Sequence, residues 1–223
     1  MKILLIADEA EPTLWEHLDR RRLEGVDLIL AGGDLPAHYL SFITCFTTAP
    51  VVYVPGNHDT AYQLKPPEGC LNADGRILEV NGVRILGLGG SMRYKKDSPY
   101  MYTEAEMAKR IRRLKYQLWR NRGFDILLTH SPMRHLGDME DLPHRGFECF
   151  RPLLETYQPK LFAYAHVHGN YGRDFLRSSE YGPTLCINGY MSYTLEMDFP
   201  DHRPPRIGKP DRGLKVDETV FPE

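Results

Sequence analysis

The sequence predicts an α/β fold from three observations. Short apolar runs rich in Val, Ile, Leu and Tyr recur along the chain, and each is bounded by Gly, Pro, Asn or Asp, which is typical of strands. Segments with helical periodicity lie between some of these runs. The length of 223 residues suits one large α/β domain, and 42% hydrophobic with 26% charged residues is ordinary for a water-soluble globule.

The strands are predicted by eight apolar runs, and we expect eight or nine strands in total. The runs are residues 2–7, 27–32, 51–56, 76–80, 83–89, 125–130, 160–166 and 184–189.

Two short segments are predicted to be helical. Residues 11–23 place Leu14, Trp15 and Leu18 on one face, and Pro12 suits a first helical turn. Residues 145–157 are a further helix candidate.

The strongest helix pattern covers residues 103–121. Thr103 and Glu106 form a capping box, and an apolar stripe consists of Met107, Ile111, Leu114 and Leu118. The helix also carries the basic residues Lys109, Arg110, Arg112, Arg113 and Lys115. We interpret them as a solvated polar face rather than as a nucleic-acid patch.

Charge and cysteine content limit the partners and the location of the protein. A net charge of −2 and a pI near 6.5 give no basic field, so long nucleic acids are not expected as partners. The four cysteines contain no C-x-x-C pair, which fits neither a zinc ribbon nor a disulfide scaffold. The first apolar stretch is too short for a signal peptide or a membrane span. We therefore expect a cytoplasmic protein without a membrane partner.

The chain divides into a domain of residues 1–199 and an irregular tail of residues 200–223. The tail is rich in Pro and charged residues. It runs either over the surface or against a neighbouring subunit of a homo-oligomer.

Five strand-like runs are followed by metal-ligand side chains at their carboxyl ends. These are Asp8; Asp34; Asn57, His58 and Asp59; His130; and His166 with His168. In open α/β sheets the ligand crevice lies beyond the carboxyl ends of the strands, so these groups are expected to converge. Taken alone, each is explained by a turn or a buried histidine. Their conjunction predicts a site of oxygen and nitrogen donors that suits Mn, Fe, Zn or Ni.

These motifs resemble those of the calcineurin-like metallophosphoesterases, which run in the order DxH, GDxxD, GNH(D/E), an isolated His after a strand, and GHxH. Here they read DEA at 8–10, GDLPA at 33–37, GNHD at 56–59, TH at 129–130 and AHVH at 165–168. The resemblance extends over roughly residues 1–199. It implies a four-layer αββα sandwich of two mixed β-sheets flanked by helices, with one or two divalent metals at the strand ends and Mn²⁺ as the expected ion.

The resemblance also implies a ligand set. One metal would be held by Asn57, His130 and His166, with Asp34 bridging to its neighbour. The second would take Asp8, Asp34 and His168, together with a histidine that would fall at position 10.

Two positions depart from the family pattern. Position 10 is alanine, so Asp8 belongs to a weakened half-site unless Glu9, Glu11 or a water fills the gap. Ala37 stands where an acid would orient the catalytic His58, which is then held less firmly, or by Asp59 or another group.

A loop motif suggests substrate contacts. The segments around residues 144–147 and 165–172 resemble a subgroup of small phosphoesterases, which makes His144, Arg145, Asn170 and Tyr171 candidates for binding substrate. The alternative is that they are ordinary loop residues.

The resemblance implies a metal-dependent phosphoesterase acting on a small phosphodiester or nucleotide. Metal-activated hydroxide would attack phosphorus, and His58 would protonate the leaving alkoxide. Two alternatives remain open. Ala10 and Ala37 favour a metal- and nucleotide-binding regulatory protein with little or no turnover, and the metal chemistry also suits a nuclease, although the acidic balance disfavours it.

Overall fold

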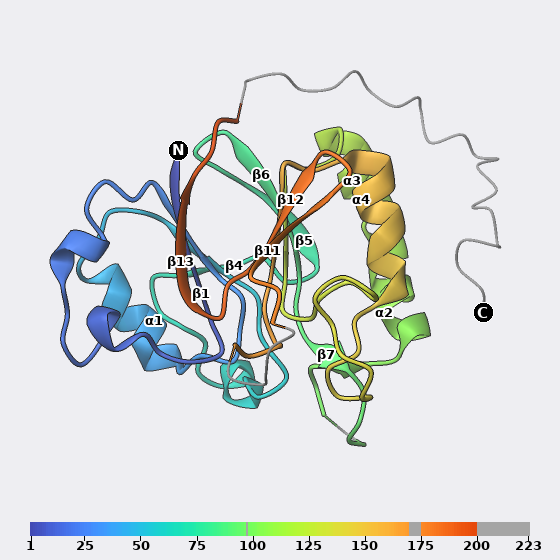
Figure 1. The fold of residues 1–223 in the computed structure, drawn as a ribbon, viewed down its shortest axis with the longest axis horizontal. Helices are drawn as coiled ribbons and strands as arrows, with labels where there is room; N and C mark the ends of the chain where they lie inside the picture. Colours follow the sequence, from blue (N-terminus) through green and yellow to red (C-terminus); the bar gives the residue numbers. More distant parts are fainter. Residues whose placement is uncertain (97, 170–174, 200–223) are drawn as a thin grey trace.

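The computed structural model describes residues 1–96, 98–169 and 175–199, which form two large sheets packed face to face between helices (Figure 1). The first sheet has the order β13 (Met191–Glu196), β1 (Lys2–Ala7), β2 (Leu28–Ala31), β3 (Val51–Tyr53) and β4 (Leu71–Asn72). The second has the order β11 (Ser178–Tyr181), β12 (Thr184–Asn188), β10 (Leu161–Tyr164), β9 (Ile126–Thr129), β6 (Val83–Leu88) and β5 (Arg76–Val80). A third, small sheet pairs β7 (Ser91–Met92) with β8 (Met101–Tyr102).

Both large sheets are mixed. Strands β1 to β4 run parallel and β13 is antiparallel to β1. In the second sheet β6, β9, β10 and β12 run parallel, with β5 and β11 antiparallel at the edges. Because the central strands are parallel, their carboxyl ends lie along one edge of each sheet.

The alternation of side chains along each strand builds the layers. In β1, Ile3 and Leu5 join the apolar cluster between the two sheets, whereas Leu4 and Ile6 join a cluster on the outer face. Helix α1 (Ala37–Thr44) packs on that outer face. Helices α2 (Glu104–Arg113), α3 (Lys115–Asn121) and α4 (Arg151–Tyr157) cover the second sheet. Figure 1 shows α1 on one side and α2 to α4 on the other, so the four-layer expectation is confirmed.

All eight predicted strands are present, but the described residues contain thirteen strands, so the expected total was too low. The additional strands are β4, β7, β8, β11 and β13. Most are only two residues long or lie at sheet edges, where sequence patterns are weak.

The helix predicted over residues 11–23 is wrong. This segment forms two 3₁₀ helices, η1 (Pro12–Leu14) and η2 (Arg20–Arg22). The Glu11 and Asp19 carboxylates accept hydrogen bonds from backbone amides two residues onward, which competes with α-helical bonding.

The other helices are shorter than predicted. The capping box of Thr103 and Glu106 is confirmed, but the helix over 103–121 divides at Leu114 into α2 and α3. In the segment 145–157 only α4 is α-helical, preceded by the 3₁₀ helix η4 (Glu148–Phe150). Helix α1 was not predicted, and Pro36 at its N-cap offers no side-chain cap. No helix in the described ranges has the length and apolarity that a membrane span requires.

Candidate metal centre

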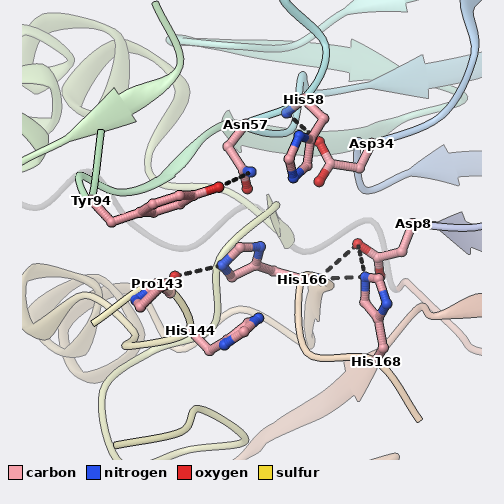
Figure 2. Close-up of a pocket in the computed structure, with 9 residues that line it drawn as sticks. All are labelled: Asp8, Asp34, Asn57, His58, Tyr94, Pro143, His144, His166 and His168. Atoms are coloured by element: carbon pink, nitrogen blue, oxygen red, sulfur yellow. Dashed lines mark hydrogen bonds and ion pairs between the residues drawn. The ribbon is translucent and has the colours of Figure 1, made fainter. Parts of the chain in front are cut away.

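Three strand ends turn sharply into the site. Asp8 after β1, Asp34 after β2 and His166 near the end of β10 all have positive φ, at 66°, 55° and 72°. This left-handed conformation is unfavourable for residues with a Cβ, and it concentrates at functional sites when the surrounding structure imposes it. Here each turn directs a side chain that can bind a metal, either a carboxylate or an imidazole, toward one pocket (Figure 2).

Two glycines allow the loops after β2 and β3 to touch. Gly33 has a φ of +97°, and a Cβ there would lie 2.4 Å from the Gly56 nitrogen. A Cβ on Gly56 would lie 2.1 Å from Asp34 Oδ1. The Asp59 carboxylate joins the two loops, because its Oδ2 accepts hydrogen bonds from the amides of Asp34 and Gly56, both at 2.7 Å.

The ligand atoms of Asp34, His130 and His166 lie within 4.8 Å of one another. His130 Nε2 is 3.3 Å from Asp34 Oδ2 and 3.1 Å from Asn57 Oδ1. Two oxygen acceptors and an imidazole nitrogen therefore meet in a site where the His130 side chain is fully buried.

Backbone carbonyls set which nitrogen of each imidazole faces the site. His130 Nδ1 lies 2.8 Å from the Gly32 carbonyl, and His166 Nε2 lies 2.7 Å from the Pro143 carbonyl. A carbonyl only accepts, so these nitrogens carry the protons. That leaves His130 Nε2 and His166 Nδ1 as the available ligand atoms, the type of outer support found around metal-bound histidines.

Electrostatics favour a positive charge within this cluster. Burial lowers the pKa of His130, but the Asp34 carboxylate outweighs burial and raises it to about 9. The same ion pair outweighs burial at Asp34 and holds its pKa well below the ordinary value. Burial lowers the pKa of His166 to about 3, so this ring is neutral. The Asp34 and Asn57 oxygens therefore lie around the protonated His130 Nε2. A divalent cation would supply the positive charge at the same place.

The Asp8 side of the site is less complete. The Asp8 side chain is fully buried, and its two oxygens accept from the His166 amide at 3.1 and 3.2 Å. Burial raises its pKa to about 7. His168 Nε2 lies 3.8 Å from Asp8 Oδ1, which places an imidazole beside this carboxylate.

Position 10 contributes no ligand to this side. Ala10 packs against the apolar cluster beneath α1. Glu11 does not replace it, because its carboxylate accepts from the Thr13 hydroxyl at 3.0 Å and from the Ser192 hydroxyl at 2.9 Å.

Glu9 lies on the other edge of His168. Its Oε1 is 3.9 Å from His168 Nδ1, whereas Nε2 is the nitrogen near Asp8. The imidazole also stacks on Tyr190, with ring centroids 5.1 Å apart and an interplanar angle of 24°. The His168 ring therefore has Glu9 near its Nδ1 edge and Tyr190 against its face, while its Nε2 lies near Asp8.

His58 lines the pocket with an exposed side chain. Its backbone amide donates to Asp34 Oδ1 at 2.7 Å, and no bond of its ring to another described residue is present. The hydrogen bonds of the Asp59 carboxylate go to the amides of Asp34 and Gly56, and none to the His58 ring is present among the described residues. Ala37 lies against the apolar cluster beneath α1.

The candidate residues meet around a pocket of about 250 Å³ (Figure 2). It is lined by Asp8, Asp34, Asn57, His58, Tyr94, Pro143, His144, His166 and His168. The His144 ring lies 5.2 Å from that of His166, and its Nδ1 is 2.7 Å from Asp141 Oδ2. His130 lies behind this wall, in contact with Asn57 and Asp34.

The other loop candidates differ in placement from His144. Arg145 does not line the pocket, and its guanidinium donates to the Glu140 carbonyl at 3.2 Å. Asn170 and Tyr171 lie outside the described residues.

Two pocket residues were missed in the sequence. Pro143 acts through a backbone carbonyl, which leaves no trace in residue type. Tyr94 follows the short strand β7 after the Gly-Gly pair at 89–90, and its hydroxyl lies 3.4 Å from Asn57 Nδ2. The nearest signal was that glycine pair, which ends a predicted strand as the ligand-bearing turns do.

A family model for the calcineurin-like phosphoesterases matches residues 1–170. The chain belongs to this family. The match contains all the candidate ligands from Asp8 to His168, and calcineurin-like phosphoesterases are hydrolases of phosphate esters that use divalent metals.

Three proteins similar to this calcineurin-like phosphoesterase share 26%, 17% and 14% sequence identity with it. The uncharacterized protein MJ1162 of Methanocaldococcus jannaschii is 26% identical over 145 residues, which cover 62% of this chain and 62% of that protein. TT1561 of Thermus thermophilus superposes with a TM-score of 0.56 at 17% identity, over 85% of this chain and 88% of its own. The phosphopantetheinyl hydrolase PptH of Mycobacterium tuberculosis gives 0.56 at 14% identity, over 92% and 98%. At these identities the two structures support the fold.

Proposed function

We propose that this protein is a metal-dependent phosphoesterase that hydrolyses a small phosphodiester or nucleotide-type substrate. The observation that carries the proposal is the convergence of Asp34, Asn57, His130 and His166, with both imidazoles held by backbone carbonyls. The pocket of about 250 Å³ has room for a phosphoryl group and the atoms next to it.

The residues have distinct roles in this proposal. Asp34, Asn57, His130 and His166 would hold one divalent cation, with Mn²⁺ as the expected ion and Fe, Zn or Ni as alternatives. Such a cation lowers the pKa of a water and offsets the charge on phosphoryl oxygens. His58 lies on the pocket wall with an exposed ring, so it can donate a proton to the leaving alkoxide.

A second cation would be held more weakly. Asp8, Asp34 and His168 are its proposed ligands, and Ala10 supplies none. Titration of metal-free protein should therefore show one tight Mn²⁺ equivalent and a second weak one.

The four cysteines support a reducing location. All are free thiols, and two of them, Cys149 and Cys186, are buried. We propose the cytoplasm as the compartment on this ground.

The test is Mn²⁺-dependent hydrolysis of bis-p-nitrophenyl phosphate by chelator-treated protein. Asp34→Asn should abolish turnover, because it removes a ligand charge while keeping the size of the side chain. Asp19→Asn is the matched control, since Asp19 pairs only with the neighbouring Arg21 in the described structure. Nucleotide binding without turnover would instead indicate a regulatory protein, and a steep loss of affinity for polynucleotide with salt would indicate a nuclease.

The role of His58 needs a second substrate. His58→Gln should lower kcat by about 10²- to 10⁴-fold for an alkyl ester, whose leaving group needs the proton. The loss should be smaller with p-nitrophenolate, a weakly basic leaving group, and Mn²⁺ affinity should stay unchanged. Equal losses on both substrates would contradict the general-acid assignment.

A further inference from the structure

Tyr94, like Pro143 and His144, lines the pocket but has no role in the proposed mechanism. It belongs to no phosphoesterase motif in the sequence and comes from the segment after β7. Figure 2 shows its side chain reaching toward Asn57, on the far side of the view from Asp8 and His168.

The hydrogen bonding of Asn57 defines what the Tyr94 hydroxyl can do. Asn57 Oδ1 faces His130 Nε2 at 3.1 Å, so its amide nitrogen faces Tyr94 and donates to the hydroxyl oxygen at 3.4 Å. An amide nitrogen only donates, which leaves the hydroxyl proton of Tyr94 for another acceptor. The described residues provide no acceptor for it.

A hydroxyl donor would complement the acceptors at the pocket. The Asp8 and Asp34 carboxylates that line it are acceptors, and the phosphoryl oxygens of an ester are acceptors as well. The bond from Asn57 is long for a hydrogen bond, so it constrains the hydroxyl only weakly. The Lys95 ammonium lies 5.3 Å from the centroid of the Tyr94 ring and places a positive charge beside this residue.

We propose that Tyr94 is a substrate-binding residue whose hydroxyl donates a hydrogen bond to a phosphoryl oxygen of the bound ester. This inference rests on the proposed phosphoesterase function. A contact with the phosphoryl group is independent of the leaving group, so loss of the hydroxyl affects esters with different leaving groups equally.

The test compares Tyr94→Phe with Tyr100→Phe. Tyr100 lies in the same segment and is also half-buried, but it does not line the pocket. Calorimetry first measures Mn²⁺ affinity on metal-free protein, and then the affinity for inorganic phosphate at saturating Mn²⁺. We expect Tyr94→Phe to weaken phosphate binding by about 3- to 30-fold, the effect of one lost hydrogen bond. Its Mn²⁺ affinity should match that of the wild type, and Tyr100→Phe should change neither value.

The outcomes separate this inference from the proposed function. Unchanged phosphate affinity in Tyr94→Phe at saturating Mn²⁺ overturns the inference, and a fall in Mn²⁺ affinity alone shows that Tyr94 only positions Asn57. Weaker phosphate binding in a protein whose wild type hydrolyses no ester supports Tyr94 as a phosphoryl contact while the proposed turnover fails. A wild type that binds no phosphate with Mn²⁺ overturns both.

Discussion

Asp59 provides a sharp test of how the site loops are held together. Its Oδ2 accepts from the buried amide of Gly56 and from the amide of Asp34, both at 2.7 Å. Asp59→Ala leaves both donors unpaired, at a cost of about 1–3 kcal/mol each. We therefore expect the free energy of unfolding of metal-free protein to fall by about 2–6 kcal/mol at pH 5.

The destabilisation caused by Asp59→Ala should be smaller at pH 7 than at pH 5, and the pKa of Asp59 explains why. Burial raises that pKa from 3.8 to about 6. Between these values the folded protein keeps a proton that the unfolded chain releases, so the wild type loses stability as pH rises. The whole change across this pKa shift is about 3 kcal/mol, of which about 1.3 kcal/mol falls between pH 5 and pH 7, and neither variant at this position shares it.

Asp59→Asn separates the acceptor from the charge. Its carbonyl oxygen can accept both amides without ionising, so at pH 7 it should be at least as stable as the wild type. Urea unfolding of chelator-treated protein at pH 5 and pH 7 measures these values. If Asp59→Asn were as unstable as Asp59→Ala at both pH values, the acceptor argument would be refuted.

Three further predictions concern the metal centre. Metal-free protein should lose about 3 kcal/mol of unfolding free energy as pH rises from 6.5 to about 9, because folded His130 retains a proton that the unfolded chain releases. Saturating Mn²⁺ should abolish that decline in urea titrations; an identical decline in His130→Gln would assign it elsewhere. Ala10→His should tighten the second Mn²⁺ site, and unchanged stoichiometry and affinity by calorimetry would show that position 10 is misassigned. Gly56→Ala places a Cβ 2.1 Å from Asp34 Oδ1 and should lower Mn²⁺ affinity, whereas Gly82→Ala, with no atom within 4 Å, should not; equal affinities would contradict the packing argument.

The sequence predicted well those features that arise from local patterns. The strands at 2–7, 125–130 and 160–166 are apolar runs bounded by turn residues, and they form β1, β9 and β10. The ligand candidates were found because parallel strands bring their carboxyl ends together, a rule that needs no side-chain coordinates.

Features that depend on distant contacts were not predictable in this way. The Glu11 carboxylate accepts a hydrogen bond from Ser192, which lies 181 residues further along the chain. The sequence around Glu11 therefore gave no indication that this carboxylate would be engaged away from the proposed metal site. The segment 11–23 shows the same limit, because its apolar residues pack as expected under α1 while the backbone forms 3₁₀ turns.

The support of the imidazoles differs between the two halves of the site. His130 and His166 each donate to a backbone carbonyl, which fixes the ring and leaves one nitrogen for a metal. The Nδ1 atom of His168 lies 3.9 Å from the Glu9 carboxylate, whose side chain is 45% exposed. A flexible, solvated partner orients a ring less firmly than a backbone carbonyl does. A weaker second cation site is therefore expected both from the alanine at position 10 and from the solvent exposure of the Glu9 carboxylate near His168.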